Sequence, residues 1–177
     1  MAITIVVEDG AGVLNANSYV TIEEARKYAG DRGIELNADD DKVASFLIQS
    51  TDYLESFACK YQGKPTFATQ PLQWPRSGVI LNCEDWPDNA IPPQLKAAQS
   101  ALAVIVNSGI PLLPTITRED YVIEETVGPI TTKYGDEVTG LADGVGMIGR
   151  FTSVDALLAP LFGDCNTSPF SLRTRRV

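Results

Sequence analysis

The chain has 177 residues, with 23 acidic and 14 basic side chains and no histidine, so its formal net charge at pH 7 is −9. This length suits one domain with short appendages rather than two full domains. The absence of histidine excludes Ser-His and Cys-His nucleophile pairs and His-ligated zinc. A net acidic chain also argues against a generic nucleic-acid binder, because phosphate neutralisation needs a basic surface. We therefore expect a protein without enzymatic activity, catalytic residues, cofactor or metal.

The N-terminal third predicts a short strand followed by a helix. Residues 3–7 are all β-branched, which predicts the strand. Thr21 and Glu24 have the spacing of a capping box, which predicts a helix that runs to about Arg32 and ends at Gly33.

A second helix is predicted from the run of three aspartates at 39–41, because carboxylates favour the N-terminal end of a helix dipole. Apolar and small residues then repeat at helical spacing, at Val43, Phe46, Leu47, Ser50, Leu54 and Phe57. The aspartates do not fit a calcium loop, since no glycine follows them and no glutamate closes the loop.

The segment from residue 63 to residue 93 contains six prolines and predicts a long ordered strap rather than regular structure. Basic and aromatic residues alternate at its start, a composition found in single-strand stacking surfaces. We favour packing of these side chains on the helices over nucleic-acid binding. The residues are Lys60, Tyr61, Lys64, Phe67, Trp74 and Arg76.

An alanine-rich helix is predicted to follow Pro92 and Pro93 and to reach Asn107. Beyond it, two β-branched runs flank a Gly-Pro pair and predict a β-hairpin over residues 121–134. Two strands alone are marginally stable, so we expect the hairpin to pair with a neighbouring subunit. The residues assigned to that contact are Tyr121, Val122, Ile123, Ile130 and Tyr134.

A glycine-rich segment at 135–149 contains the pattern GxGxxG at 144–149. A dinucleotide site would need a buried strand before the pattern and a full helix after it. Neither is predicted, so we interpret the segment as a loop. A last short helix is predicted from an N-cap at Ser153 to Leu161.

The C-terminal tail differs from the rest of the chain in charge. All 23 acidic residues lie at or before Asp164, whereas the last ten residues carry a charge of +3. Apolar anchors beside a cationic end favour docking on a protein partner, and contacts with nucleic-acid phosphates are the alternative. The arm residues are Pro169, Phe170, Leu172, Arg173, Arg175 and Arg176.

Together these patterns predict a mainly α fold: a small helical bundle with a long proline-rich strap, one β-hairpin and an extended C-terminal arm. The expected division is a helical domain at residues 1–162 and a flexible arm at residues 163–177.

Five segments in this order resemble tailed-bacteriophage proteins often labelled DnaT-like, which are similar to head-tail connectors, also called head-completion adaptors. They are residues 16–21, 44–54, 72–78, 91–93 and 151–161. The resemblance covers roughly residues 15–162.

The resemblance implies a structural protein of the virion neck, assembled in the host cytoplasm. About twelve copies would form a ring beneath the portal protein, with the C-terminal arm docked on the portal. The other implied partners are tail or neck (stopper) proteins and genomic DNA that passes an acidic channel without specific binding; no membrane is involved. The alternative is a primosomal, DnaT-like replication protein that binds single-stranded nucleic acid.

Overall fold

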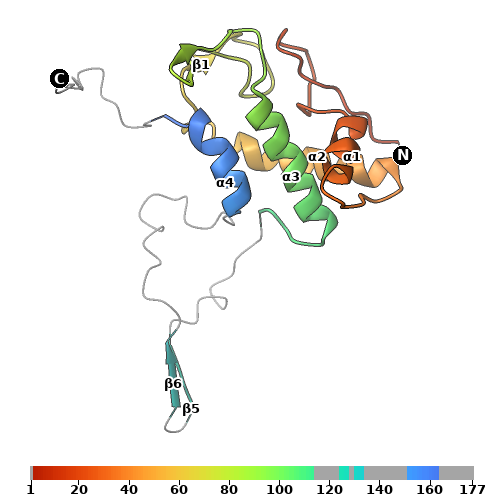
Figure 1. Cartoon of the computed structure of the whole chain (residues 1–177), viewed down its shortest axis with the longest axis vertical. Coiled ribbons are helices and arrows are strands. Elements are labelled where there is room, and N and C mark those ends of the chain that lie inside the picture. The colour runs from red at the N-terminus through yellow and green to blue at the C-terminus, as the bar shows by residue number, and fades with distance from the viewer. Residues whose placement is uncertain (1, 114–123, 128–129, 134–150, 164–177) are drawn as a thin grey trace, which may run out of the picture.

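A computed structural model describes residues 2–113, 124–127, 130–133 and 151–163 (Figure 1). The described chain is mainly helical, as predicted, with short antiparallel strand pairs. Its α-helices are α1 (Ile22–Gly30), α2 (Asp40–Glu55), α3 (Pro93–Asn107) and α4 (Thr152–Leu158), and a 3₁₀ helix, η3 (Ala159–Leu161), follows α4. None of the helices in these described ranges is long and apolar enough to cross a membrane.

Local sequence signals set the beginning of the first three helices. Thr21 accepts a hydrogen bond from the backbone N–H of Glu24, whose side chain accepts from the Thr21 N–H, so the predicted capping box is present. The Asp39 side chain caps α2 by accepting from the N–H of Asp41. Pro93 occupies the first turn of α3, where its missing N–H costs no hydrogen bond.

Helix α3 lies at the centre of the body and contacts α1, α2 and α4 (Figure 1). Leu95, Ala98 and Leu102 are fully buried on it, and its small residues let the neighbouring helices approach closely. The buried amide of Gln99 joins three segments: it accepts from the Tyr19 N–H and donates to the Leu47 carbonyl and to the hydroxyls of Ser18 and Thr51. The centre of the core is therefore polar but hydrogen-bonded.

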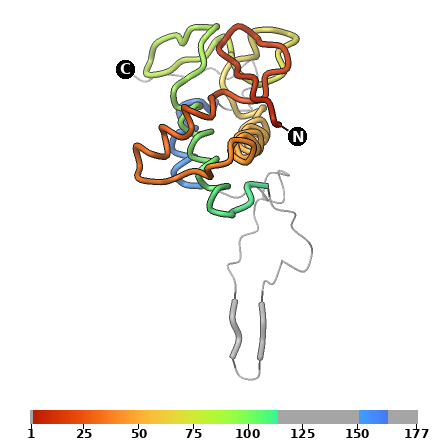
Figure 2. The backbone as a smooth tube through the Cα atoms, turned by 90° about the vertical axis from the view of Figure 1, so that its right-hand side faces the viewer, coloured from red at the N-terminus to blue at the C-terminus, as the bar shows by residue number. Residues whose placement is uncertain are grey.

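The strap contains two antiparallel strand pairs that the proline count did not predict. Strand β1 (Lys64–Pro65) pairs with β2 (Arg76–Ser77), and β3 (Ile80–Leu81) pairs with β4 (Glu84–Asp85). The β3–β4 turn places both Asn82 and Cys83 at positive φ, the backbone that a two-residue type I′ turn requires. Figure 2 shows the strap at the same end of the body as the N-terminal loop.

Two boundary predictions were wrong. Residues 3–7 form no strand; Val7 makes a single bridge with Ser18, and the Val6 N–H donates to the side chain of Asn17 instead of to a neighbouring strand. Helix α4 begins at Thr152 after Phe151, without a side-chain cap, so Ser153 lies inside the helix. The N-terminal residues bond to Asn17 and Ser18 instead of to a strand, and the Phe151 carbonyl already accepts from the N–H groups of Val154 and Asp155, so the helix begins before Ser153.

Strands β5 (Glu124–Val127) and β6 (Ile130–Lys133) form the predicted hairpin, in a register that pairs Glu124 with Lys133 and Val127 with Ile130. The described strands are shorter than the predicted range of 121–134.

Candidate functional site

The aromatic and basic residues of the strap divide into a buried group and an exposed group. Trp74 is fully buried, and Tyr61 and Arg76 are nearly so. The Tyr61 ring packs edge-on against Trp74, with 5.6 Å between ring centroids. These three residues hold the strap on the helices, as the packing interpretation predicted, and none of them offers a surface for a ligand.

Arg76 acts as an internal anchor for the strap. Its Nε donates to the Gln62 carbonyl at 2.7 Å, its Nη2 to the Gly63 carbonyl at 2.9 Å, and its Nη1 to the Gln73 side chain at 3.1 Å. Burial lowers the pKa of the guanidinium, and the neighbouring Tyr61, Tyr19 and Glu55 oppose that shift. The guanidinium of Arg76 is therefore buried and bound to two backbone carbonyls and the Gln73 side chain, so it is not available to a phosphate.

A second polar group joins α2 to the strap. One carboxylate oxygen of Glu55 accepts from the Tyr19 hydroxyl, and the other accepts from the Gln73 N–H at 2.8 Å. Burial raises the pKa of Glu55 above its usual value, although both hydrogen bonds act in the opposite direction. Burial also raises the pKa of Tyr19.

The buried carboxylate of Glu8 organises the N-terminal loop. It accepts hydrogen bonds from the N–H groups of Gly10, Gly12 and Val13, at 2.8–2.9 Å. Three N–H groups that converge on one carboxylate resemble an anion-binding backbone nest, here filled by the chain's own side chain. The sequence signal for it, a glutamate shortly before two glycines, is weak, and the sequence analysis did not identify it.

Lys64 and Phe67 remain exposed in the first part of the strap. Lys60 is half-buried, with its Nζ 5.2 Å from the centroid of the Phe57 ring. Neither lysine forms an ion pair within the described part of the chain. Among the six residues that the sequence analysis grouped, only Lys60, Lys64 and Phe67 can therefore reach a ligand.

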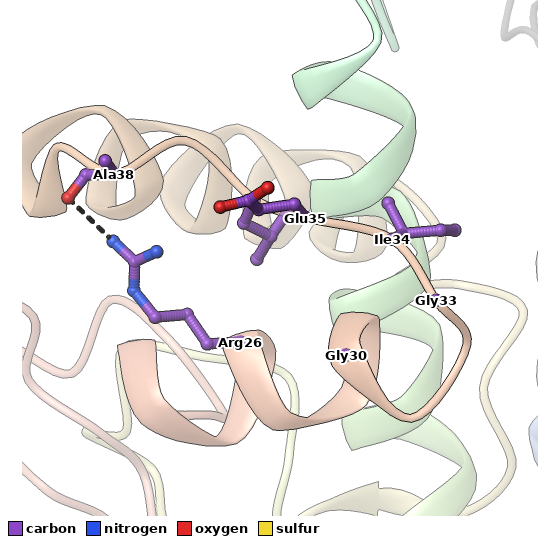
Figure 3. A pocket seen from close by; sticks show the side chains of 7 residues that line it. Arg26, Gly30, Gly33, Ile34, Glu35 and Ala38 are labelled. Atoms are coloured by element: carbon purple, nitrogen blue, oxygen red, sulfur yellow. Dashed lines mark hydrogen bonds between the residues drawn. The ribbon is translucent and has the colours of Figure 1, made fainter.

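An open surface pocket of about 540 Å³ lies between α1 and the segment that precedes α2 (Figure 3). Arg26 reaches across it from α1 and donates to the Ala38 carbonyl at 3.2 Å and to the Asp40 carboxylate at 2.7 Å. Because Asp40 neutralises this cation, the pocket offers no free positive charge. Its other lining residues are Gly30, Gly33, Ile34, Glu35 and Leu36.

The aspartate run at 39–41 has a structural role in each position. Asp39 caps α2, Asp40 pairs with Arg26, and Asp41 accepts from the Ile3 N–H. Within the described ranges, no group of three or more side chains is placed to hold a metal ion.

Comparison with known families matches residues 3–177 to the family described as "Putative DnaT-like ssDNA binding protein". The chain belongs to this family. No curated protein and no solved structure matches the chain. The family match extends over both the helical body and the basic C-terminal segment.

Membership of the DnaT-like family overturns the expectation of a phage head-tail connector. The family match contradicts the roles that the resemblance implied, which were a ring beneath the portal, portal and tail proteins as partners, and DNA that passes without binding. The connector prediction rested on the resemblance of five short segments, and the net charge of −9 argued against nucleic-acid binding. Net charge is a weak argument on that point, because nucleic-acid binding depends on how the cations are distributed.

Most of the site residues predicted from the tail and the hairpin lie outside the described residues. This holds for all six arm residues between Pro169 and Arg176 and for the flanking residues of the hairpin, Tyr121, Val122, Ile123 and Tyr134. Ile130 begins strand β6. The inter-subunit contact of the hairpin stays a prediction.

Proposed function

We propose that this protein binds single-stranded DNA. The observation that supports the proposal is the match of residues 3–177 to the DnaT-like single-stranded-DNA-binding family. The match covers nearly the whole chain, so the activity is proposed for the whole chain rather than for one segment of it.

An acidic protein can bind DNA if its cations are concentrated where the strand lies. In the described body, Arg26, Lys27 and Lys96 are neutralised by Asp40, Asp31 and Glu24, and Arg76 is buried. The three ion pairs and the burial of Arg76 together remove four cations from the set that can contact phosphates. Three of the other ten basic residues, Arg173, Arg175 and Arg176, are concentrated in the last five positions of the chain. The rest are spread along it, at Arg32, Lys42, Lys60, Lys64, Arg118, Lys133 and Arg150.

The last thirteen residues contain three arginines and no acidic residue. Arg173, Arg175 and Arg176 are proposed to contact phosphates, which was the alternative role of the arm. Arginine suits this role because its guanidinium forms bidentate hydrogen bonds with phosphate oxygens and remains charged at all relevant pH values.

The test is fluorescence anisotropy of the full-length protein with a labelled oligothymidylate at increasing salt concentrations. We expect saturable binding that weakens steeply with salt, because each neutralised phosphate releases counterions. A duplex of the same length should compete weakly, and a matching oligoribonucleotide measures the preference for DNA over RNA. If no binding occurs at low salt, the proposal is wrong.

A further inference from the structure

Phe67 differs from the other aromatic residues of the described chain in its exposure. It retains 38% of its surface, whereas every other described aromatic ring is buried or half-buried. An exposed phenylalanine needs no explanation by itself, since single apolar side chains are common on surfaces. The way in which this ring is held is more informative.

The N-terminal loop supports one side of the Phe67 ring. Gly12 has a φ of +73° and lies so close that a Cβ on it would come within 2.6 Å of Cδ2 of the ring. The Gly12 N–H is itself bound by the buried carboxylate of Glu8 at 2.9 Å. The ring therefore rests on backbone whose position a buried charge fixes, and its remaining surface faces solvent.

The strap holds the backbone of Phe67 equally firmly. The Phe67 N–H donates to the side chain of Gln70, which in turn donates to the carbonyls of Leu72 and Pro75. The preceding residue, Thr66, donates through its N–H to the Pro75 carbonyl and through its hydroxyl to the Asp88 carbonyl. Because the backbone of this exposed ring is already held by several hydrogen bonds, binding a ligand costs it little further conformational entropy.

Exposed residues of both charges lie in the segments near Phe67. Lys64 lies three residues before Phe67, in β1, and is exposed. Exposed carboxylates lie in the neighbouring loops, at Asp9 and Asp88. A phosphate near Lys64 would be attracted, whereas a phosphate near Asp9 or Asp88 would be repelled.

We propose that Phe67 is a stacking platform for one base of single-stranded DNA and that Lys64 contacts an adjacent phosphate. This inference rests on the proposed function. A nucleobase fits the observations better than an apolar protein segment, because a single exposed ring three residues from an exposed lysine matches the aromatic and cationic composition of single-strand sites. The backbone support from Gly12 and Gln70 presets the ring for the stack.

The test measures binding of the full-length protein to two oligodeoxynucleotides, one labelled at its end and one carrying a fluorescent adenine analogue whose emission is quenched by stacking. The variants are Phe67→Ala, Phe67→Leu and Phe67→Tyr, with Ile80→Ala as a matched control. Ile80 is an exposed apolar residue of the same strap, on β3, and is 55% exposed. Circular dichroism and thermal unfolding establish that each variant folds.

We expect Phe67→Ala and Phe67→Leu to weaken binding about tenfold and to abolish quenching, and Phe67→Tyr to retain both. Ile80→Ala should bind like the wild type. Lys64→Gln should lower the salt slope of binding by about 0.7.

The outcomes separate the two proposals. If the wild-type protein does not bind single-stranded DNA, the proposed function fails and the stacking site with it. If it binds but Phe67→Leu binds equally well and still quenches the adenine analogue, only the stacking site is wrong. If Phe67→Ala unfolds, the comparison of the leucine and tyrosine variants gives the same decision.

Discussion

The hydroxyl of Tyr19 lies 2.5 Å from a carboxylate oxygen of Glu55 and donates a hydrogen bond to it, across 36 residues of sequence. The same hydroxyl accepts from the backbone N–H of Trp74 at 3.3 Å, and the second carboxylate oxygen accepts from the backbone N–H of Gln73. Helix α2, the N-terminal segment and the strap therefore meet at one carboxylate. A change in its protonation affects all three.

The first prediction concerns the pH dependence of stability. Burial raises the pKa of Glu55 in the folded protein, so between the unfolded and folded pKa values the folded state binds more protons than the unfolded state. The Glu55 contribution to the free energy of unfolding is therefore full below the unfolded pKa and is lost as the pH rises through the folded pKa. Glu55→Gln should remove this decline.

Urea unfolding of the wild type and Glu55→Gln between about pH 4 and pH 7 measures the difference. Glu84→Gln is the control, because Glu84 is exposed on β4 and lacks the buried hydrogen bonds. A stability difference between wild type and Glu55→Gln that stays constant across this range would contradict the prediction.

The second prediction concerns the anchor of the strap. Arg76→Ala leaves the carbonyls of Gln62 and Gly63 without their donor in a buried site, so we expect a loss of about 3 kcal/mol in the free energy of unfolding. Arg76→Lys should recover only part of this, since an ammonium group cannot reproduce the fork of donors. Lys64→Ala, at an exposed position of the same strap, should change stability by less than about 0.5 kcal/mol. Equal effects of the two alanine substitutions would show that Arg76 is not an anchor.

The third prediction concerns the nest around Glu8. Glu8→Ala leaves the N–H groups of Gly10, Gly12 and Val13 without their acceptor, and we expect a loss of about 2 kcal/mol. Amide hydrogen exchange of these three residues should accelerate, because the loop opens without the carboxylate. Asp9→Ala is the matched control: Asp9 is exposed and accepts only from the Ala11 N–H. Unchanged exchange at Gly12 in the Glu8 variant would refute the role.

The parts of the fold that were predictable from sequence depend on neighbouring residues. The capping box of Thr21 and Glu24, the cap at Asp39 and the proline at the start of α3 each act within a few residues, so their spacing identifies them. The hairpin that contains β5 and β6 was recognisable for the same reason, from two β-branched runs around a Gly-Pro pair.

The parts that could not be predicted depend on residues far apart in the chain. Gln99 reaches Ser18 across 81 positions, and no local pattern marks it as the centre of the core. The exposure of Phe67 and the burial of Trp74 likewise follow from where the strap turns, although the two residues share one compositional pattern. The sequence therefore indicated the composition of the candidate site but not which of its side chains reach the surface. Net charge argued against nucleic-acid binding, but it sums over buried, paired and exposed groups alike.

The last prediction concerns the basic C-terminal segment. Replacing Arg173, Arg175 and Arg176 with glutamine should weaken binding of single-stranded DNA at low salt and lower the slope of log affinity against log salt concentration by about 2, because each phosphate contact on a single strand contributes about 0.7. The matched control replaces Arg26, Lys27 and Lys96 with glutamine, since these three cations are already neutralised by acidic partners. Anisotropy titrations at several salt concentrations measure both slopes.

If the two triple variants lose the same slope, the contacts are spread over the whole protein and the C-terminal segment has no special role. If only the C-terminal variant loses it, while Phe67→Ala loses affinity without a change in slope, the arginines bind the backbone and the strap binds a base.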